Sequence, residues 1–317
     1  MEDLKYLIRV DCITFNQASY IEAAMNGFCI QDTNFPFVCT IIDDASTDGE
    51  PEVIRRYLAE HFAINDEKTA RKEETDDYVM QFAQHKTNKN CFFAVFFLKY
   101  NHYSIKKSKL PYLTDWEDTK YVAICEGDDY WIDPLKLQKQ FDFMESHPEC
   151  SMCFHASRKL MPSGELIPYV PSPKKEIYPT EDIIIGGGAF MATNAMFYRN
   201  ELLQSEPRPA FWSECPIGDL PMALFFAAKG RVGFIDEEMS VYRVGAIGSW
   251  SVRQNTLKKR RSHYKAIIKM FNQFDEYTEF KYHWAIEKKK NRNKRNHIKT
   301  SMLLIVRETL KKIGIKV

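Results

Sequence analysis

The first 150 residues alternate apolar runs with amphipathic runs, and this alternation limits the fold more than any other feature of the chain. Apolar runs of the kind that forms buried strands span residues 7–15, 37–42, 91–98 and 121–125. Helical patterns span residues 18–30, 51–61 and 135–146. Strands that alternate with helices form a mostly parallel sheet with helices on both faces. We therefore expect an α/β fold.

Polar side chains follow three of the predicted strands. Thr14 and Asn16 follow the first strand, Asp43 and Asp44 end the second, and an acidic segment follows the run at residues 121–125. Parallel sheets bind ligands at the carboxyl ends of their strands, where these side chains would gather. The pattern therefore predicts one shared site.

The acidic segment, CEGDDYWIDPLKLQKQ at residues 125–140, places Glu126, Asp128 and Asp129 within four positions. Carboxylates this close repel one another unless a cation lies between them, and oxygen ligands suit Mg²⁺ or Mn²⁺ that holds a phosphate. The alternative is an acidic turn followed by a helix start at Asp133-Pro134, because Gly-Asp-Asp is common in turns. Taken alone, the segment fits both interpretations.

Shorter elements are predicted in the rest of the body. Strands are expected over residues 151–161, 165–170, 195–199, 232–235 and 239–243, the first two of them as a hairpin. Gly218-Asp219 opens a predicted helix over residues 222–229. The charged segment 65–89 predicts either a helix or a mobile excursion.

The last 65 residues are strongly basic. Residues 253–317 contain 19 Lys and Arg against 5 Asp and Glu, whereas residues 1–252 contain 25 against 38. The basic part reads as helices, and an apolar patch lies over residues 302–313. This combination predicts peripheral docking on an anionic membrane surface. The alternative is a solvated helical cap on the fold. We do not expect nucleic acid as a partner, because no binding motif accompanies the charge.

Other features bear on the compartment. The N-terminal residues lack the layout of a secretory signal, and the longest apolar run, residues 91–98, is too short to span a bilayer as a helix. The eight cysteines are scattered, mostly within apolar runs, which predicts reduced thiols. We expect a cytoplasmic protein, with any membrane contact peripheral and on the inner face.

Together these motifs resemble the family 2 glycosyltransferases, over about residues 5–250. The matching segments, in order, are VDCITFNQASYI, IIDDASTDG, CEGDDYWIDPLKLQKQ, GDLPM and MSVYR. Ala45 stands where the family usually has Gly, and Glu126 where it usually has Asp. The resemblance implies a GT-A fold, with a Rossmann-like, mostly parallel sheet flanked by helices. We divide the chain into a GT-A domain, 1–252, and a helical extension, 253–317, with nucleotide-sugar and acceptor halves at 1–150 and 151–252.

The resemblance also assigns the donor-binding side. A nucleotide base needs an acceptor for its imide N–H, and a carboxylate at a strand end supplies one. Asp44 is the first choice for this contact and Asp43 the second, while Thr14 and Asn16 are expected to contact the base or ribose. The alternative is that these aspartates only terminate a strand and cap a helix.

The diphosphate leaving group needs a cation, for which Mn²⁺ or Mg²⁺ is expected. Asp128 matches the family's metal-binding aspartate, and Glu126 is expected to reach the donor. Asp129 is expected as a second metal ligand, with a role in holding the loop as the alternative. Arg243, with the glycine-containing stretch that follows at residues 245–250, is predicted to fold over the diphosphate. The alternative pairs Arg243 with Glu237 or Glu238.

Asp219 matches the family's catalytic base, and Glu214 is the alternative. A helix start lowers a carboxylate pKa, which opposes strong basicity in Asp219. Trp131 and Asn194 are expected to contact the acceptor. The predicted reaction is an inverting, metal-dependent transfer of a sugar from a UDP-sugar to a hydroxyl of a glycan, one carried on a lipid in bacterial surface polysaccharide synthesis. The alternatives are a metal-dependent nucleotidyltransferase and a non-catalytic glycan-binding protein.

Overall fold

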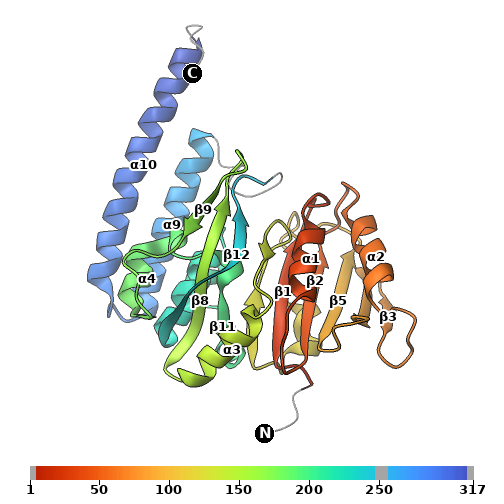
Figure 1. The fold of residues 1–317 in the computed structure, drawn as a ribbon. Helices are drawn as coiled ribbons and strands as arrows, with labels where there is room; N and C mark the ends of the chain where they lie inside the picture. Colours follow the sequence, from red (N-terminus) through yellow and green to blue (C-terminus); the bar gives the residue numbers. More distant parts are fainter. Residues whose placement is uncertain (1–4, 247–255, 313–317) are drawn as a thin grey trace.

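One mixed sheet runs through the whole body of the protein (Figure 1). The computed structural model describes residues 5–246 and 256–312, with side chains as far as Leu303. The sheet order is β10-β12-β8-β11-β6-β1-β2-β5-β4-β3, with β7 on β12 and β9 on β8. The strands are β1 Ile8–Thr14, β2 Phe37–Asp43, β3 Arg71–Glu74, β4 Tyr78–Gln84, β5 Cys91–Leu98, β6 Tyr121–Ile124, β7 Tyr130–Trp131, β8 Cys150–Leu160, β9 Leu166–Tyr169, β10 Ile177–Tyr178, β11 Phe197–Arg199 and β12 Arg231–Arg243.

Helices flank the sheet, and two long helices form the C-terminal part of the chain. The α-helices are α1 Ile21–Cys29, α2 Glu50–His61, α3 Lys136–Ser146, α4 Thr180–Gly186, α5 Asn200–Gln204, α6 Ala210–Ser213, α7 Asp219–Lys229, α9 Leu257–Tyr277 and α10 His283–Lys312. Three 3₁₀ helices join them: η1 Leu110–Trp116, η2 Gly187–Ala189 and η3 Thr193–Ala195. The expected α/β class with a mostly parallel core sheet is confirmed.

The parallel core aligns the carboxyl ends of the strands that precede the predicted site. β1 pairs in parallel with β2 and β6, and β8 pairs in parallel with β12. Thr14 is in register with Asp43, so these two strand ends lie side by side. Because β11 is antiparallel to both β6 and β8, the β6 and β12 strands also point the same way. The four strands that precede the predicted site, β1, β2, β6 and β12, therefore end at one edge of the sheet, as do β5 and β8.

Two predictions for local elements were wrong. Residues 65–89 form neither a helix nor an excursion: β3 and β4 lie there and extend the sheet through antiparallel pairing of β4 with β5. Met80 and Ala83 of β4 are buried. A few apolar positions are therefore enough to attach this charged stretch to the core. The two strands expected near residues 232–243 are one long strand, β12, whose register shifts between Ile235 and Ser240.

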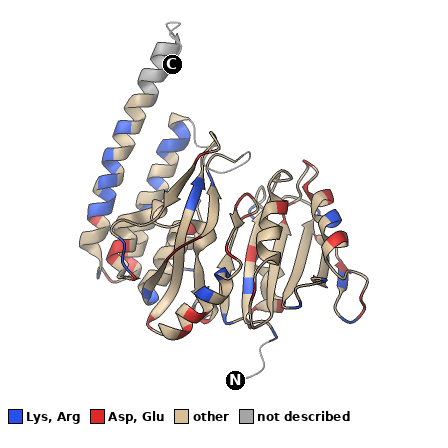
Figure 2. Ribbon diagram, in the orientation of Figure 1, with Lys and Arg blue, Asp and Glu red and all other residues tan. Residues whose placement is uncertain are grey.

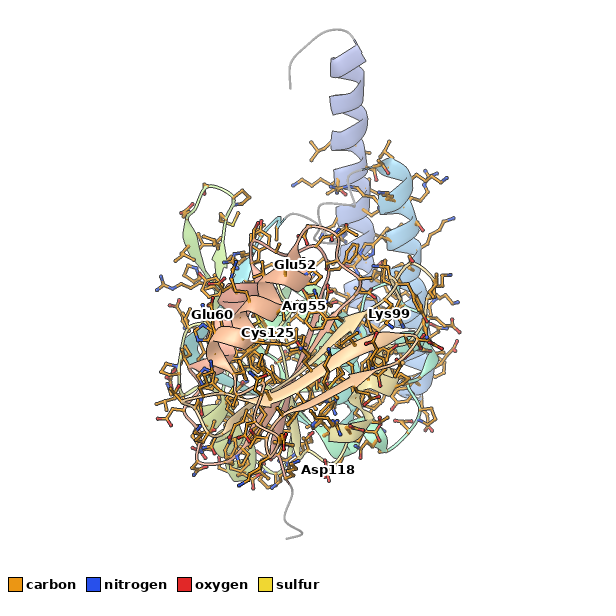
Figure 3. The ribbon with its side chains drawn as sticks, turned by 90° about the vertical axis from the view of Figure 1, so that its right-hand side faces the viewer. Glu52, Arg55, Glu60, Lys99, Asp118 and Cys125 are labelled. Atoms are coloured by element: carbon orange, nitrogen blue, oxygen red, sulfur yellow. The ribbon has the colours of Figure 1, made fainter. Side chains whose placement is uncertain are left out.

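The outer surface of α2 is charged, while its inner surface is apolar. Figure 3 labels Glu52, Arg55 and Glu60 on this helix. All three are exposed, and the Arg55 guanidinium lies 4.3 Å from the centre of the Phe97 ring. Ile54 and Leu58 face the core. α2 is therefore an ordinary surface helix whose start, rather than its length, approaches the predicted site.

The helices α9 and α10 pack against the body only along part of their length. Phe271 and Phe274 of α9 and Ile286 of α10 are buried in the same core cluster as Phe225 of α7. Lys289 donates a hydrogen bond of 2.8 Å to the carbonyl oxygen of Gly186, at the end of α4. Beyond this point α10 projects past the body, toward the end of the molecule at which the parallel strands finish (Figure 1). Across the described residues, we find no helix with the length and apolarity that crossing a membrane requires.

Candidate active site

A buried carboxylate, Glu50, joins the two loops that follow β1 and β2. It accepts a hydrogen bond from the Thr14 hydroxyl, one of 2.8 Å from the Gln17 backbone N–H, and one of 2.8 Å from the Ser46 hydroxyl. Burial raises the pKa of Glu50, although these three donors oppose the shift. The sequence analysis missed this residue. The sequence feature that could have indicated it is its position, directly after the IIDDASTDG segment and at the start of α2.

The same two loops contain two residues with left-handed backbone conformations. Asn16 has a φ of 55° and Ala45 a φ of 59°. The Asn16 side-chain oxygen accepts a hydrogen bond of 2.8 Å from the Thr47 N–H, and its own N–H donates to Ser46 Oγ. Asparagine tolerates this conformation, whereas alanine pays a steric cost for it. A glycine at position 45 would avoid that cost.

Asp44 is buried and held by the segment that follows β5. Its carboxylate accepts hydrogen bonds from the backbone N–H groups of His102, at 2.7 Å, and Tyr103, at 3.1 Å, and lies 2.9 Å from Lys109 Nζ. Asp43 is equally buried, accepts a bond of 3.2 Å from the Ser46 N–H, and has its pKa raised to about 6 by burial. The Asp44 carboxylate is thus already engaged by three donors of the protein. Its contact with a nucleotide base stays a prediction.

The acidic segment presents three carboxylates whose charged forms are disfavoured. Although part of the Glu126 side chain is open to solvent, the surrounding protein and the charges of Asp128 and Asp219 raise its pKa to about 8. Burial raises the pKa of Asp128, and burial with the charges of its neighbours raises that of Asp129. The Oδ2 atom of Asp129 is buried and has no hydrogen-bond partner among the described residues. Such an atom is costly unless a cation or proton completes it.

Gly127 lets this acidic segment approach the loop after β1. A Cβ on Gly127 would lie only 2.6 Å from Gln17 Oε1 and would also collide with the Thr14 hydroxyl. The Gln17 side chain also acts on Asp128, whose pKa it lowers against the larger effect of burial. Through Gln17, the loops fixed by Glu50 are therefore in direct contact with the acidic segment, as the single shared site requires.

Arg243 lies at the end of β12, against the same acidic segment. Its guanidinium donates a hydrogen bond of 2.8 Å to the Asp128 carbonyl oxygen, and its backbone N–H donates one of 2.8 Å to Asp129 Oδ1. The rings of Tyr20 and Tyr130 lie 5.1 and 4.6 Å from the guanidinium carbon. The alternative pairing of Arg243 was wrong. Glu237 pairs with Lys139 and Glu238 with Arg158. Residues 247–250 of the predicted lid lie outside the described residues.

Asp219 is the first residue of α7, and its charge acts on Glu126. Burial raises the pKa of Asp219, and this effect exceeds the lowering by backbone N–H groups at the helix start. The lowering expected from the helix start is present, but burial outweighs it. Glu214 is exposed and forms an ion pair of 2.7 Å with Lys269, which lowers its pKa. A paired, acidic Glu214 is a poor base, so the geometry favours Asp219.

Two tyrosines that the sequence analysis missed border the carboxylates. Burial raises the pKa of Tyr169 to about 12, and the charges of Asp219 and Asp129 add to the shift. Tyr242 responds in the same way, mainly to burial and then to Asp129 and Glu126. The two rings pack edge to face at 6.1 Å. They connect the β8–β9 hairpin with the end of β12 and form an aromatic border to the site.

Trp131 and Asn194 are not placed to contact an acceptor, which corrects our expectation. Trp131 is 2% exposed, packs on Phe28, and donates its indole N–H to the Asn194 carbonyl oxygen at 3.0 Å. Asn194 is fully buried and bonds to Val241 and Ser240. Their polar groups are used inside the protein, so both residues support β7 and β12 rather than line the site.

The donor set fits a cation only together with a ligand. In the part of the chain that the structure describes, no three His, Cys, Asp or Glu side chains are grouped so that they could hold a metal. Mg²⁺ at nucleotide sites is commonly bound by one or two carboxylates, phosphate oxygens and water. Asp128 and the unpartnered Oδ2 of Asp129 match that smaller demand. These two residues fit a metal whose remaining ligands come from a diphosphate.

Comparison with solved structures places this architecture. The mannosyltransferase PcManGT from Pyrobaculum calidifontis, solved with GDP-Man and Mn²⁺, superimposes with a TM-score of 0.51 at 13% identity, covering 97% of this chain and 80% of that one. S. aureus TarS 1-349 in complex with UDP gives a TM-score of 0.47 at 15% identity, over 85% of this chain and 72% of that one. The chain has a GT-A glycosyltransferase fold.

Sequence comparison adds relatives of this GT-A chain but no family. The uncharacterized proteins Mb1547 of Mycobacterium bovis and Rv1520 of Mycobacterium tuberculosis are each 29% identical over 248 residues, which is 75% of this chain. The match covers 59% of the length of each relative, so the GT-A chain spans little more than half of these proteins. No family model matches the chain.

Proposed function

We propose that the protein is an inverting glycosyltransferase that transfers a sugar from a UDP-sugar to a hydroxyl of a glycan acceptor. The observation that carries the proposal is the set of carboxylates with raised pKa values, Glu126, Asp128 and Asp129, which faces Asp219 at the carboxyl edge of a GT-A sheet. Carboxylates in a structural turn would be paired with protein cations or exposed, whereas Asp128 and Asp129 are buried and form no ion pair with a described residue.

The donor would bind with its nucleotide at the β1 and β2 ends and its diphosphate at the acidic segment. Asp43, Asp44, Thr14 and Asn16 stand on the nucleotide side, and Asp128 and Asp129 would hold Mn²⁺ or Mg²⁺. When bound, the metal would offset the negative charge that the leaving diphosphate develops. PcManGT was solved with a nucleotide sugar and Mn²⁺, which supports this choice of cofactor. Arg243, beside Asp128, would add a permanent positive charge on the same side.

Asp219 would act as the base. The acceptor oxygen attacks the anomeric carbon, the bond from that carbon to the diphosphate oxygen breaks, and the acceptor proton passes to the Asp219 carboxylate. A single displacement inverts the anomeric centre. Burial raises the pKa of Asp219, which brings it toward the range in which a carboxylate accepts a proton effectively. Asp219 and Glu126 also interact electrostatically, so the base stands close to the donor side.

The test combines donor screening with one substitution. Thermal shift with a panel of UDP-, GDP- and dTDP-sugars, with and without Mn²⁺, should show stabilisation by a UDP-sugar that requires the metal. In Asp219→Asn we expect this shift to persist while sugar transfer and slow donor hydrolysis fall by about 10²–10⁴-fold. Glu214→Gln is the matched control and should keep its activity.

Three results would contradict the proposal. Near-normal turnover in Asp219→Asn would place the base elsewhere. Stabilisation by nucleoside triphosphates alone, with release of pyrophosphate, would favour a nucleotidyltransferase. Glycan binding without any nucleotide-sugar hydrolysis would favour a non-catalytic protein of the same fold.

A further inference from the structure

The antiparallel pairing of α9 and α10 brings together two basic segments that are far apart in the sequence. The Tyr264 ring of α9 stacks on the His297 ring of α10 with centroids 4.3 Å apart. The first turns of α9 therefore lie beside α10 at residues 294–303. We call the exposed residues of these two segments the distal tip; its six principal cations are Lys258, Arg261, Lys265, Lys294, Arg295 and Lys299. Figure 2 shows Lys and Arg gathered on both helices.

Among the described residues, these cations have no acidic partner, unlike the basic residues nearer the body. Lys269 pairs with Glu214, Lys290 pairs with Glu287, and Lys289 binds the end of α4. By contrast, none of the six tip cations has an ion pair with a described residue, and α9 contains no acidic residue before Asp275. The basic residues nearer the body pair with acidic side chains or bind a helix end, whereas the six tip cations face solvent.

An exposed apolar stripe accompanies the charges. Ile298, Met302 and Leu303 are 45%, 61% and 60% exposed. Together with Arg295 and Lys299 they occupy positions i, i+3, i+4, i+7 and i+8, which form one face of an α-helix. Because α9 ends its contact with α10 near this point, nothing among the described residues covers the stripe. Apolar side chains flanked by Lys and Arg are the pattern of helices that lie in a membrane interface.

We propose that the distal tip docks on the surface of an anionic lipid bilayer. Charge complementarity selects an anionic partner, and the apolar stripe selects one that can also take up hydrocarbon side chains. A second copy of the chain would bring like charges together, and a nucleic acid would leave the stripe in water. The tip projects past the end of the molecule at which the parallel strands finish, so docking turns the candidate site toward the bilayer (Figure 1).

Docking would also narrow the acceptor to one carried on a lipid, a consequence that rests on the proposed function. The docking itself does not rest on it, because vesicle binding requires no sugar transfer. The two proposals can therefore fail separately.

The experiment is vesicle flotation with the full chain at low and moderate salt, using pure phosphatidylcholine vesicles and vesicles that also contain phosphatidylglycerol. We expect binding only to the second kind, weakened by salt. Each basic residue near an anionic surface changes partitioning by about fivefold, so Lys294→Glu with Lys299→Glu should lower it by more than about tenfold. Met302→Ser with Leu303→Ser should lower it at constant charge.

The matched control is Lys72→Glu with Lys89→Glu, which makes the same charge change on exposed lysines at the β3–β4 end of the sheet. It should leave flotation nearly unchanged, and all variants should keep the wild-type melting temperature. Equal flotation with pure phosphatidylcholine, or an equal loss in the control pair, would overturn the proposal. So would retained flotation in the serine pair together with equally tight binding of an RNA oligonucleotide, or tip-dependent dimerisation without vesicle binding.

Discussion

The two sides of the candidate site differ in how many hydrogen-bond donors the protein supplies to their carboxylates. On the nucleotide side, Glu50 and Asp44 each accept hydrogen bonds from several donors of the protein. On the acidic side, Asp129 keeps a buried oxygen without a partner and the Glu126 pKa is raised to about 8. The first arrangement stabilises the fold at once. The second costs stability until something binds.

The difference separates residues that shape the site from residues that wait for a ligand. A carboxylate satisfied by the protein rigidifies its loop, whereas an unsatisfied one retains binding capacity at the expense of stability. If this division is right, substitutions on the two sides should differ in kind. Those on the acidic side should change ligand binding and spare the fold, and those on the nucleotide side should change both.

Asp128→Asn should give the largest effect. It removes a charge that no protein donor fully satisfies, so we expect the fold to persist with an equal or higher melting temperature. Affinity for UDP in the presence of Mn²⁺ should fall by at least about 10²-fold, as when a ligand or its close support is lost. Calorimetric titration checks this. Unchanged UDP–Mn²⁺ affinity would end the metal assignment.

Glu50→Gln should destabilise the protein by about 2 kcal/mol, because an amide N–H₂ then faces groups that donate to the carboxylate. Urea unfolding measures this loss. Nucleotide affinity should fall as well, since Thr14, Gln17 and Ser46 lose their common partner. Glu52→Gln, two residues along α2 and exposed, is the control. If Glu50→Gln melts like the wild type, the network does not hold the two loops.

The acidic side should make donor binding depend on pH. Glu126 has its pKa raised to about 8 in the ligand-free protein, so it is largely protonated below that pH and releases a proton when a cation binds. We expect Mn²⁺-dependent nucleotide affinity to rise by up to about tenfold per pH unit below about pH 8, and to level off above it. Titrations in buffers of different ionisation enthalpy measure the proton. Glu126→Gln should flatten the profile; a flat wild-type profile would exclude the coupling.

Ala45→Gly should have the smallest effect and the opposite sign. Its φ of 59° costs an L-residue about 1 kcal/mol, and glycine removes that cost, less the entropy glycine loses on folding. We expect a slightly higher melting temperature with nucleotide binding preserved. Ala63→Gly, outside the left-handed positions, should destabilise instead. A lower melting temperature in Ala45→Gly would show that the entropy glycine loses on folding outweighs the steric cost of alanine at this position.

The sequence predicted what depends on local pattern. The strands that end at Thr14 and Asp43 were found from unbroken apolar runs, and their shared edge followed from the parallel arrangement. The acidic segment was found because its carboxylates are neighbours in the chain. That these carboxylates differ from those of the nucleotide side could not be found in this way, since the difference depends on which atoms have hydrogen-bond partners.

What the sequence could not supply were contacts between distant segments. Asp44 is bound by backbone groups 58 and 59 residues later, and backbone donors leave no trace in residue identity. Trp131 was predicted to contact the acceptor, but it is buried and donates its indole N–H to the Asn194 carbonyl oxygen. Glu50 looked like one more charged residue at a helix start. Only its burial shows that it joins two loops.

The length of α10 beyond the body has a geometric consequence. From Lys289, which is fixed to the end of α4, to Leu303 the helix rises by about 21 Å, at about 1.5 Å per residue. If the distal tip rests on a bilayer, this segment acts as a spacer of set height between the lipid and the end of α4. Under the proposed function, the protein would then favour acceptor sugars that stand at one distance above the membrane. Lengthening the helix by whole turns should shift that preference outward.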